Sequence, residues 1–296
     1  MSVDFCGLTL AHPILNGSGT FDALAAETVF GAELHKRFPF SAYVSKTITL
    51  QPRLGNPPPR LWEAASGLIN SIGLPNRGLV GYMEHDLPRL AQLPVPLITN
   101  VMGADAEELR ELVAACDAQQ AIAAIELNVS CPNVKTGLDI GSDPSQLEAV
   151  CLAVRAATSK PLIVKLTPNT ADVAACAAAA ESGGADAVSL INTLRATALH
   201  PRTRARWLGG GNGGLSGPAI RVVALAQVAA VAARVGIPVI GMGGVQSSEH
   251  ARDLLDVGAS LVAVGSESFR DPGVAGRIAA ELTGAPSAPL RASPGR

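Results

Sequence analysis

Charged and aromatic residues are scarce in this sequence of 296 residues, at 16% and 3% respectively. An average soluble domain has about 25% charged residues, so the composition predicts a large apolar core. It also excludes a disordered chain, because disordered chains are rich in charge. The net charge is −2 and no block of like charge occurs, which argues against a nucleic-acid-binding protein.

Long apolar runs and paired cysteines are also missing. No run reaches the roughly 18 residues that span a membrane, and the most hydrophobic helical stretch, 221–235, is interrupted by Gln227 and Arg234. The N-terminal residues lack the pattern of a secretory signal, so we expect a cytoplasmic protein. The cysteines are odd in number and widely spaced, with no CxxC pair. This spacing excludes a disulfide framework, a metal site or an iron–sulfur cluster built from cysteine.

Short apolar runs alternate with Ala-rich amphipathic stretches along most of the chain. Runs that are apolar on both faces indicate a parallel sheet covered by helices. Eight such units predict a single (β/α)8 TIM barrel over residues 1–283, followed by a disordered tail at 284–296. The predicted strands are 13–17, 42–46, 97–101, 123–128, 162–166, 187–191, 238–242 and 261–264, and the clearest helices are 106–118, 144–158, 171–182, 218–235 and 248–256.

Two long segments do not follow this alternation. Residues 48–76 are rich in proline and residues 194–214 are rich in glycine, and they follow the second and sixth predicted strands. We interpret them as long insertions in βα loops, which in this architecture lie over the active-site face. Within the first insertion, Arg53, Asn56 and Arg60 could act at the site, but solvated loop positions are favoured for them.

Polar residues end several of the apolar strands. Lys46 and Lys165 close two of them, although only five of the 23 basic residues are lysine. A lysine at the lip of an apolar barrel loses hydration, so it either loses its proton or binds an anion; the alternative is that its amine extends to solvent. Amide side chains offer donors and acceptors, which suits a flat ring such as uracil or flavin. The asparagines expected around this pocket are Asn70, Asn100, Asn128, Asn133 and Asn192.

Glycines end the seventh and eighth strands, at 241–244 and at Gly265, and each group leads toward a helix. Backbone N–H groups there form the usual phosphate site of such a barrel. Gly217, at the start of the long helix after strand six, is a third candidate. The alternative is that these glycines serve only tight turns.

Cys131 lies in a loop after the fourth strand, before a proline and between Asn128 and Asn133. Cys116, Cys151 and Cys176 instead lie in Ala- and Val-rich helical stretches, where cysteine behaves as a small hydrophobic residue. Because no histidine is close to Cys131 in sequence, proton transfer by its thiolate is favoured over covalent catalysis. The alternative is an inert buried thiol.

Together these motifs resemble class 1 dihydroorotate dehydrogenase. The resemblance runs in order from about residue 3 to residue 272, and its most specific part is Asn128-Val-Ser-Cys131-Pro-Asn133. In detail the chain is most similar to the class 1B catalytic subunit, which passes electrons to NAD through a partner carrying FAD and an iron–sulfur cluster. The quinone-dependent class fits less well, because its members have an N-terminal membrane-associating extension and a serine base.

The resemblance implies the oxidation of dihydroorotate to orotate in de novo pyrimidine (UMP) biosynthesis. Cys131 would take the proton from C5 while C6 gives a hydride to N5 of FMN, and Lys165 would lie near N1 and O2 of the flavin. The implied substrate-binding residues are Lys46, Asn70, Ser71, Ile72, Gly73, Leu74, Asn128, Asn133, Asn192 and Thr193. The implied FMN-binding residues are Ser18, Lys46, Thr47, Asn100, Asn128, Lys165, Ile191, Gly217, Gly243, Gly244, Gly265 and Ser266.

The expected assembly is a homodimer, or a heterotetramer with an electron-transfer subunit that holds FAD and [2Fe-2S]. Other interpretations stay open: a fumarate-dependent enzyme of class 1A type, another FMN barrel that reduces pyrimidines, and a subunit that binds without catalysis. A lyase or isomerase that binds a phosphorylated substrate on the same barrel is a non-redox alternative. Residues 194–208 match the family only loosely, so their role is open.

Overall fold

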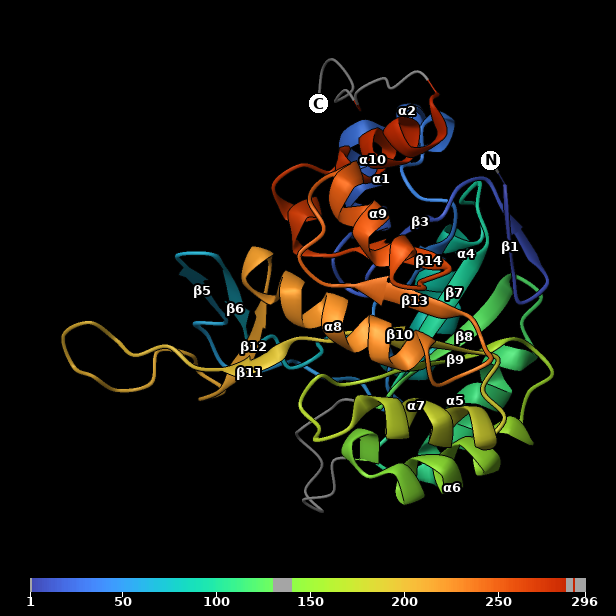
Figure 1. Cartoon of the computed structure of the whole chain (residues 1–296), viewed down its shortest axis with the longest axis horizontal. Coiled ribbons are helices and arrows are strands. Elements are labelled where there is room, and N and C mark those ends of the chain that lie inside the picture. The colour runs from blue at the N-terminus through green and yellow to red at the C-terminus, as the bar shows by residue number, and fades with distance from the viewer. Residues whose placement is uncertain (1, 130–139, 286–289, 291–296) are drawn as a thin grey trace.

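Eight parallel strands form the centre of the computed structural model, which describes residues 2–129, 140–285 and 290 (Figure 1). Around the sheet the strands follow the order β3, β14, β13, β10, β9, β8, β7, β4. Their bounds are β3 (Ile14–Asn16), β4 (Tyr43–Val44), β7 (Leu97–Val101), β8 (Ile122–Asn128), β9 (Leu162–Lys165), β10 (Ala187–Leu190), β13 (Val239–Met242) and β14 (Leu261–Val264). Each lies within a predicted strand or overlaps it to within a residue, so the predicted barrel is confirmed.

The barrel closes through a side chain. The Val44 N–H donates to Oδ1 of Asn16 over 2.8 Å, and Nδ2 of Asn16 donates to the Val44 carbonyl over 2.8 Å. The amide of Asn16 therefore takes the place of a neighbouring strand's backbone between β3 and β4. Nearer the amino-terminal ends of the same two strands, the Ser41 N–H donates to the Ile14 carbonyl over 2.9 Å.

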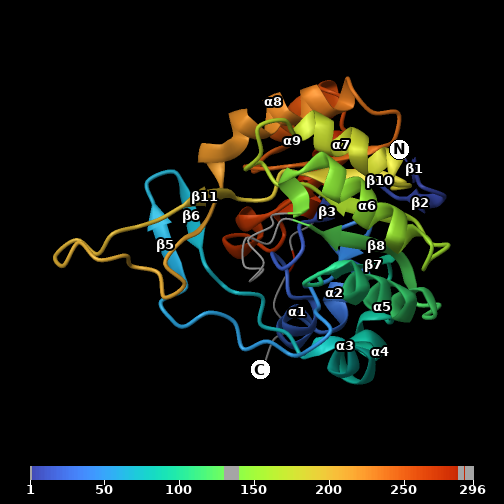
Figure 2. The ribbon, with the colours of Figure 1, turned by 90° about the horizontal axis from the view of Figure 1, so that it is seen from below.

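Helices surround the strands (Figure 2). Aspartates at positions 105, 143 and 172 cap the helices α5, α6 and α7, since each carboxylate accepts hydrogen bonds from backbone N–H groups in the first turn. The helices are α1 (Ala23–Phe30), α2 (Ala32–Lys36), α3 (Gly78–Gly81), α4 (Leu87–Leu90), α5 (Ala106–Asp117), α6 (Pro144–Arg155), α7 (Val173–Ser182), α8 (Arg221–Ala232), α9 (Ser248–Asp256) and α10 (Val274–Thr283). Shorter turns are η1 (Tyr82–Asp86), η2 (Ile140–Ser142), η3 (Pro218–Ile220) and η4 (Ser266–Phe269).

Two apolar clusters make up most of the core. One fills the barrel interior, where Ile98, Ala124 and Ile163 pack together, and the hairpin of β1 (Val3–Phe5) and β2 (Leu8–Leu10) closes its lower end. The larger one lies between the strands and the helices. Because side chains alternate along a strand, the residue two positions after each interior residue also faces inward, closer to the carboxyl end.

The two insertions form a second sheet. Its strands are β11 (Leu194–Ala196), β12 (Gly213–Ser216), β6 (Gly67–Asn70) and β5 (Leu61–Ala64), in this order and antiparallel. The interpretation of these segments as loops is therefore incomplete. Glycine is required in β12 because a Cβ on Gly214 would lie 1.9 Å from Oγ1 of Thr193.

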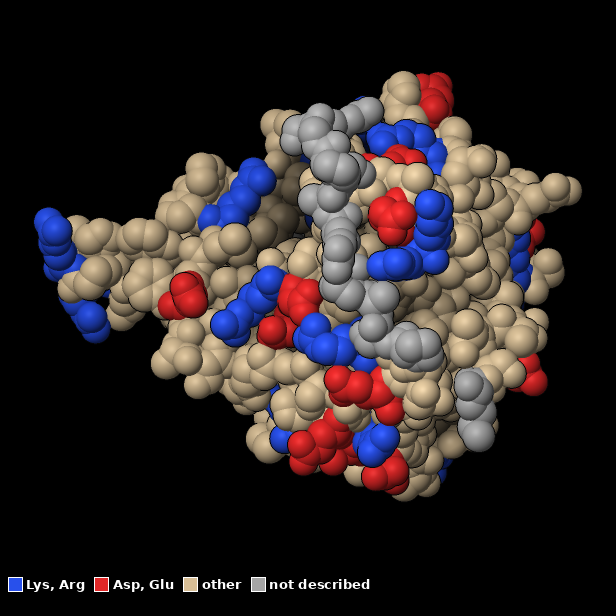
Figure 3. All heavy atoms as spheres, turned by 90° about the horizontal axis from the view of Figure 1, so that it is seen from above, with Lys and Arg blue, Asp and Glu red and all other residues tan. Residues whose placement is uncertain are grey.

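The second sheet projects from the barrel, at the left of Figure 1. At its tip Arg202, Arg204 and Arg206 are exposed, and Figure 3 shows basic side chains gathered there. Within the part of the chain that the structure describes, no helix has the length and hydrophobicity to cross a membrane. Of the predicted tail 284–296, residues 286–289 and 291–296 lie outside the described residues.

Candidate active site

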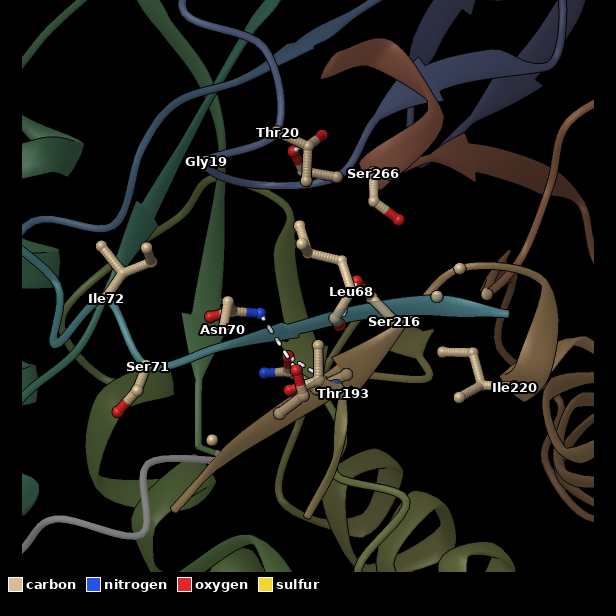
Figure 4. A pocket seen from close by; sticks show the side chains of 18 of the residues that line it. Gly19, Thr20, Leu68, Asn70, Ser71, Ile72, Thr193, Ser216, Ile220 and Ser266 are labelled. Atoms are coloured by element: carbon tan, nitrogen blue, oxygen red, sulfur yellow. Dashed lines mark hydrogen bonds between the residues drawn. The ribbon is translucent and has the colours of Figure 1, made fainter. Parts of the chain in front are cut away.

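A cavity of about 1310 Å³ opens at the carboxyl ends of the barrel strands and is bounded on one side by the second sheet. Residues from the loops after several barrel strands meet there with residues of β6 and β12 (Figure 4). Of the predicted site residues, those that line it are Ser18, Lys46, Thr47, Asn70, Ser71, Ile72, Gly73, Leu74, Asn128, Lys165, Ile191, Asn192, Thr193, Gly217, Gly243, Gly244, Gly265 and Ser266.

One described residue of the predicted set, Asn100, does not line the cavity. Asn100 is fully buried inside the barrel. Cys131 and Asn133 lie outside the described residues. The role of Cys131 as the base of the reaction therefore stays a prediction.

Positive charge in the cavity lining comes from Lys46, Lys165, Arg195 and Arg270, of which the two lysines belong to the predicted site. Lys165 is the last residue of β9 and is only 6% exposed, because strand alternation directs it into the barrel mouth. Lys46 follows β4 and is exposed along the cavity lining. Desolvation by the surrounding protein lowers the pKa of Lys46, and the charge of Asp22 partly offsets this effect. An anionic ligand in the cavity would favour the charged form of Lys46.

Polar side chains from both insertions meet at the second sheet. Nδ2 of Asn70 donates to the Gly214 carbonyl over 3.3 Å, and Thr193 lies against the same glycine (Figure 4). Oγ of Ser71 donates to the Asn212 carbonyl over 2.8 Å. The short strands of the second sheet thus fix the positions of residues that are far apart in the sequence.

A glycine-lined recess forms the opposite part of the cavity. Gly243 and Gly244 have φ angles of 136° and 69°, which side-chain-bearing residues rarely adopt. A Cβ on Gly243 would lie 2.7 Å from the Cβ of Ala224, and one on Gly244 would lie 2.8 Å from the Cβ of Arg221. Gly217 and Gly265 directly precede η3 and η4. Because these glycines have no side chain, a ligand can approach their backbone N–H groups closely. Such N–H groups form a site suited to a phosphate.

The residues present fit FMN. The glycine recess suits its phosphate, the amide and hydroxyl groups suit the polar edge of its ring, and Lys165 can balance the negative charge that a flavin gains on reduction. Oδ1 of Asn100 is buried and has no hydrogen-bond partner among the described residues.

Two residues, Glu126 beneath the cavity lining and Asn56 within it, were not predicted to belong to the site. Glu126 is 2% exposed and its carboxylate accepts hydrogen bonds from Asn100 and Ser189. The available signal was a carboxylate within the apolar run Ile125-Glu126-Leu127, because such a charge is buried only with partners. Asn56, predicted to be solvated, lines the cavity and donates to Oγ of Ser71 over 3.0 Å; that prediction was wrong.

Cys6, Cys116 and Cys151 are unsuited to acid–base catalysis. Burial, together with the nearby charge of Asp186, raises the pKa of Cys6 to about 11. Burial also raises the pKa values of Cys116 and Cys151 to about 12. These thiols stay protonated at neutral pH. For Cys116 and Cys151 this agrees with the prediction that they behave as small hydrophobic residues.

The fold and the cavity define a (β/α)8-barrel protein with a site suited to a phosphorylated cofactor at the carboxyl ends of its strands. A model of the dihydroorotate dehydrogenase family matches residues 1–285, and the chain belongs to this family. Its members of this type are FMN-dependent oxidoreductases that act on a CH–CH bond.

Curated relatives agree with this assignment. The chain is 44% identical to a protein of Maridesulfovibrio salexigens and 42% identical to proteins of Listeria monocytogenes and Geobacter sulfurreducens, over 95% of this chain and 92% of each relative. All three are named dihydroorotate dehydrogenase B (NAD(+)), catalytic subunit. The resemblance to class 1B is therefore confirmed.

A solved structure supports the fold. The dihydroorotate dehydrogenase of Eimeria tenella, crystallised with ferulenol, matches with a TM-score of 0.75 at 23% identity, over 95% of this chain and 83% of that one. At this identity the likeness shows the architecture and nothing of the ligand.

Proposed function

We propose that the chain oxidises dihydroorotate to orotate as the catalytic subunit of an NAD-linked dihydroorotate dehydrogenase of pyrimidine biosynthesis. The observation that carries this proposal is one cavity in which Lys46, Asn70, Asn128 and Thr193 meet beside the glycine recess. The charge and the hydrogen-bonding groups of this set complement a pyrimidine that bears a carboxylate.

The two ends of the cavity have separate tasks in this proposal. Lys46 binds the substrate carboxylate, which also supports its charged form against desolvation. Asn70 and Thr193, which the second sheet holds in place, bind the amide edge of the ring together with Asn128, Asn192 and the segment 71–74. Asn133 completes the set from outside the described residues.

Cys131 removes the proton from C5 of the substrate. An unperturbed thiol has a pKa of about 8.5, so the fraction of active thiolate rises with pH across the neutral range. A positioned general base of this kind contributes typically about 10²- to 10⁴-fold to the rate. FMN, when bound, supplies the acceptor for the hydride that leaves C6, and Lys165 stabilises the negative charge that then develops.

The final acceptor is NAD, reached through a second subunit. The names of the three relatives, each a catalytic subunit of an NAD(+)-dependent enzyme, support this proposal. We propose that this second subunit carries FAD and [2Fe-2S] and joins a homodimer of this chain in a cytoplasmic heterotetramer. Fumarate as the direct acceptor is the competing outcome.

Anaerobic addition of dihydroorotate to the purified flavoprotein tests the reaction. We expect the visible flavin absorption to bleach, and dihydrouracil to leave it unchanged. Bleaching by dihydrouracil alone would identify a different pyrimidine oxidoreductase, and a purified protein without a flavin spectrum would contradict a redox function.

Purification from the native host tests the acceptor. We expect a partner with FAD and iron–sulfur absorption to co-purify and to confer reduction of NAD by dihydroorotate. Rapid reoxidation by fumarate without that partner would contradict the NAD assignment.

A further inference from the structure

The side-chain amide of Asn169 joins the barrel to the second sheet. Asn169 follows β9 and lines the cavity. Its Nδ2 donates to the Thr193 carbonyl over 3.0 Å, and its Oδ1 accepts from the Arg195 N–H over 2.8 Å. One amide thus pairs with the carbonyl and the N–H of two residues that lie two positions apart, as the backbone of a neighbouring strand would.

These two hydrogen bonds lie where the chain leaves the barrel. Thr193 and Arg195 flank Leu194, the first residue of β11. Closer to the barrel, the Asn192 N–H donates to the Leu166 carbonyl over 3.2 Å. The segment that follows β10 is therefore attached at both of its ends to the segment that follows β9.

The contacts of the Asn169 amide argue against direct binding of a ligand. Both hydrogens of the NH2 group are donated, one to the Thr193 carbonyl and the other to Oγ1 of Thr167 over 3.0 Å. The opposite orientation would set the amide oxygen against the Thr193 carbonyl and the NH2 group against the Arg195 N–H. Asn169 therefore acts on a ligand through the residues that it holds.

The residues that Asn169 holds are connected to both substrate-facing parts of the second sheet. Thr193 lines the cavity and lies against Gly214 of β12. Arg195 pairs in register with Gly214, whose carbonyl accepts a hydrogen bond from Nδ2 of Asn70 over 3.3 Å. A displacement of β11 would thus move Thr193 and Asn70 relative to Lys165, which belongs to the barrel.

We propose that Asn169 is a positioning residue, which attaches β11 to the barrel so that Thr193 and Asn70 meet the substrate at a fixed distance from the flavin site. This inference rests on the proposed function, in which Thr193 and Asn70 bind the pyrimidine. Residues that are ordered before binding do not have to lose conformational entropy when the ligand arrives. The expected effect of losing Asn169 is weaker binding of the pyrimidine with little change for FMN, because most of the glycine recess follows β13 and β14.

Asn169→Leu removes the amide with little change in volume. The Thr193 carbonyl and the Arg195 N–H lose their partner, so we expect the start of β11 to shift. Orotate, the product of the proposed reaction, should bind the flavin-loaded variant at least about tenfold more weakly than the wild type. Calorimetric titration measures this affinity. The affinity for FMN, from the quenching of flavin fluorescence, should change less than about threefold.

Two results of these titrations would overturn the proposal. One is wild-type affinity of Asn169→Leu for orotate, since the amide would then position nothing that the pyrimidine contacts. The other is a loss of FMN affinity as large as the loss of orotate affinity, since the whole cavity would then be disturbed.

A double-mutant cycle shows whether Asn169 acts through Thr193. Thr193→Val removes the hydroxyl and keeps the shape of the side chain. If Asn169 positions this hydroxyl, Asn169→Leu should weaken orotate binding only about threefold in the Thr193→Val background, against about tenfold in the wild type. Independent, multiplying losses would refute the positioning role.

Gln227→Leu is the matched control. Nε2 of Gln227 on α8 donates to the carbonyl of Pro168, the residue before Asn169, over 3.3 Å. This variant also replaces an amide by leucine and removes a hydrogen bond to the same loop, but Gln227 is not among the residues that line the cavity. We expect it to keep the wild-type affinity for orotate. Equal losses in both variants would mean that loosening of the loop explains them, and would refute the role of Asn169.

Hydrogen exchange of the Arg195 N–H, followed by NMR, tests the contact without any ligand. In the wild type the bond to Oδ1 should slow exchange about tenfold. Asn169→Ala, in which water can reach the freed groups in place of the amide, should lose this protection and bind orotate more weakly even if the leucine variant does not fold. Fast exchange in the wild type, or protection that survives in Asn169→Ala, would overturn the proposal.

The two kinds of measurement separate this inference from the proposed function. A chain in which Asn169 protects Arg195 but which does not bind orotate would contradict the proposed function and leave the attachment of β11 intact. A chain that binds orotate equally well with and without Asn169 would contradict the positioning role and leave the proposed function intact.

Discussion

Gly243→Ala is the sharpest test of where the phosphate binds. At a φ of 136°, a side chain costs roughly 1–3 kcal/mol of backbone strain. The added Cβ would also lie 2.7 Å from the Cβ of Ala224, and such overpacking costs about 1–3 kcal/mol. We therefore expect a loss of about 2–6 kcal/mol in the free energy of unfolding if the two effects add, and a displaced backbone at the recess.

The chain offers a matched control for this strain. Gly258 has a φ of 108°, and a Cβ there would lie 2.6 Å from the Cβ of Ala232. It lies between α9 and the start of β14, at the end of the barrel away from the cavity. Gly258→Ala should thus lose a similar free energy of unfolding, measured in urea, without a change in the binding site.

The assay compares FMN with riboflavin, which lacks the phosphate. Loss of one or two charge-assisted hydrogen bonds, each worth about 1.5–3 kcal/mol, should weaken FMN binding by Gly243→Ala at least tenfold. Its affinity for riboflavin should change little. Gly258→Ala should keep the wild-type ratio of the two affinities. If Gly243→Ala loses as much stability as Gly258→Ala but keeps the wild-type ratio of the affinities for FMN and riboflavin, the placement of the phosphate beside Gly243 is refuted.

Three further predictions concern single residues. Asn16→Leu leaves the N–H and carbonyl of Val44 unpaired, so urea unfolding should show a loss of about 2–6 kcal/mol; a loss below about 1 kcal/mol would contradict closure through this amide. The lowered pKa of Lys46 means that its charge is lost at a lower pH than in a free lysine. The affinity for orotate should therefore fall as pH rises through that pKa. The Lys46→Met variant should bind orotate weakly at every pH. Iodoacetamide at neutral pH should label Cys131 and spare Cys6, Cys116 and Cys151, whose pKa values are about 11 and 12. Orotate should protect Cys131, and mass spectrometry reads the label; labelling of Cys116 in the native protein would contradict its burial.

The barrel could be predicted because its strands carry their own signal. Strands such as 162–165 and 261–264 are buried at every position, so each reads as an apolar run without reference to any other part of the chain. The second sheet has no such signal. Its strands are only three or four residues long, two of the four contain glycine, and β12 pairs with β6, which lies about 145 residues earlier in the chain.

The same difference separates the site residues that were predicted from those that were not. Lys46, Asn128 and Lys165 were found because carboxyl ends of parallel strands meet at one edge, whatever the loops do. Asn56 was misplaced because its contact with Ser71 depends on how a proline-rich insertion folds back on itself. Asn16 was assigned to a strand without a role, since nothing in its neighbourhood reveals that β3 and β4 lack a continuous backbone ladder.

Along four strands, the side chains that face the barrel interior change from apolar to polar within two residues. Ile98, Ala124, Ile163 and Ala187 belong to the apolar interior, and the next inward residues are Asn100, Glu126, Lys165 and Ser189. Because both layers share the same strands, the packing that stabilises the barrel also fixes the height of the polar layer beneath the cavity. A register shift of one residue would turn these side chains outward. The scarcity of charge in the sequence is thus consistent with a fold in which buried charges are placed where a ligand or a partner side chain can use them.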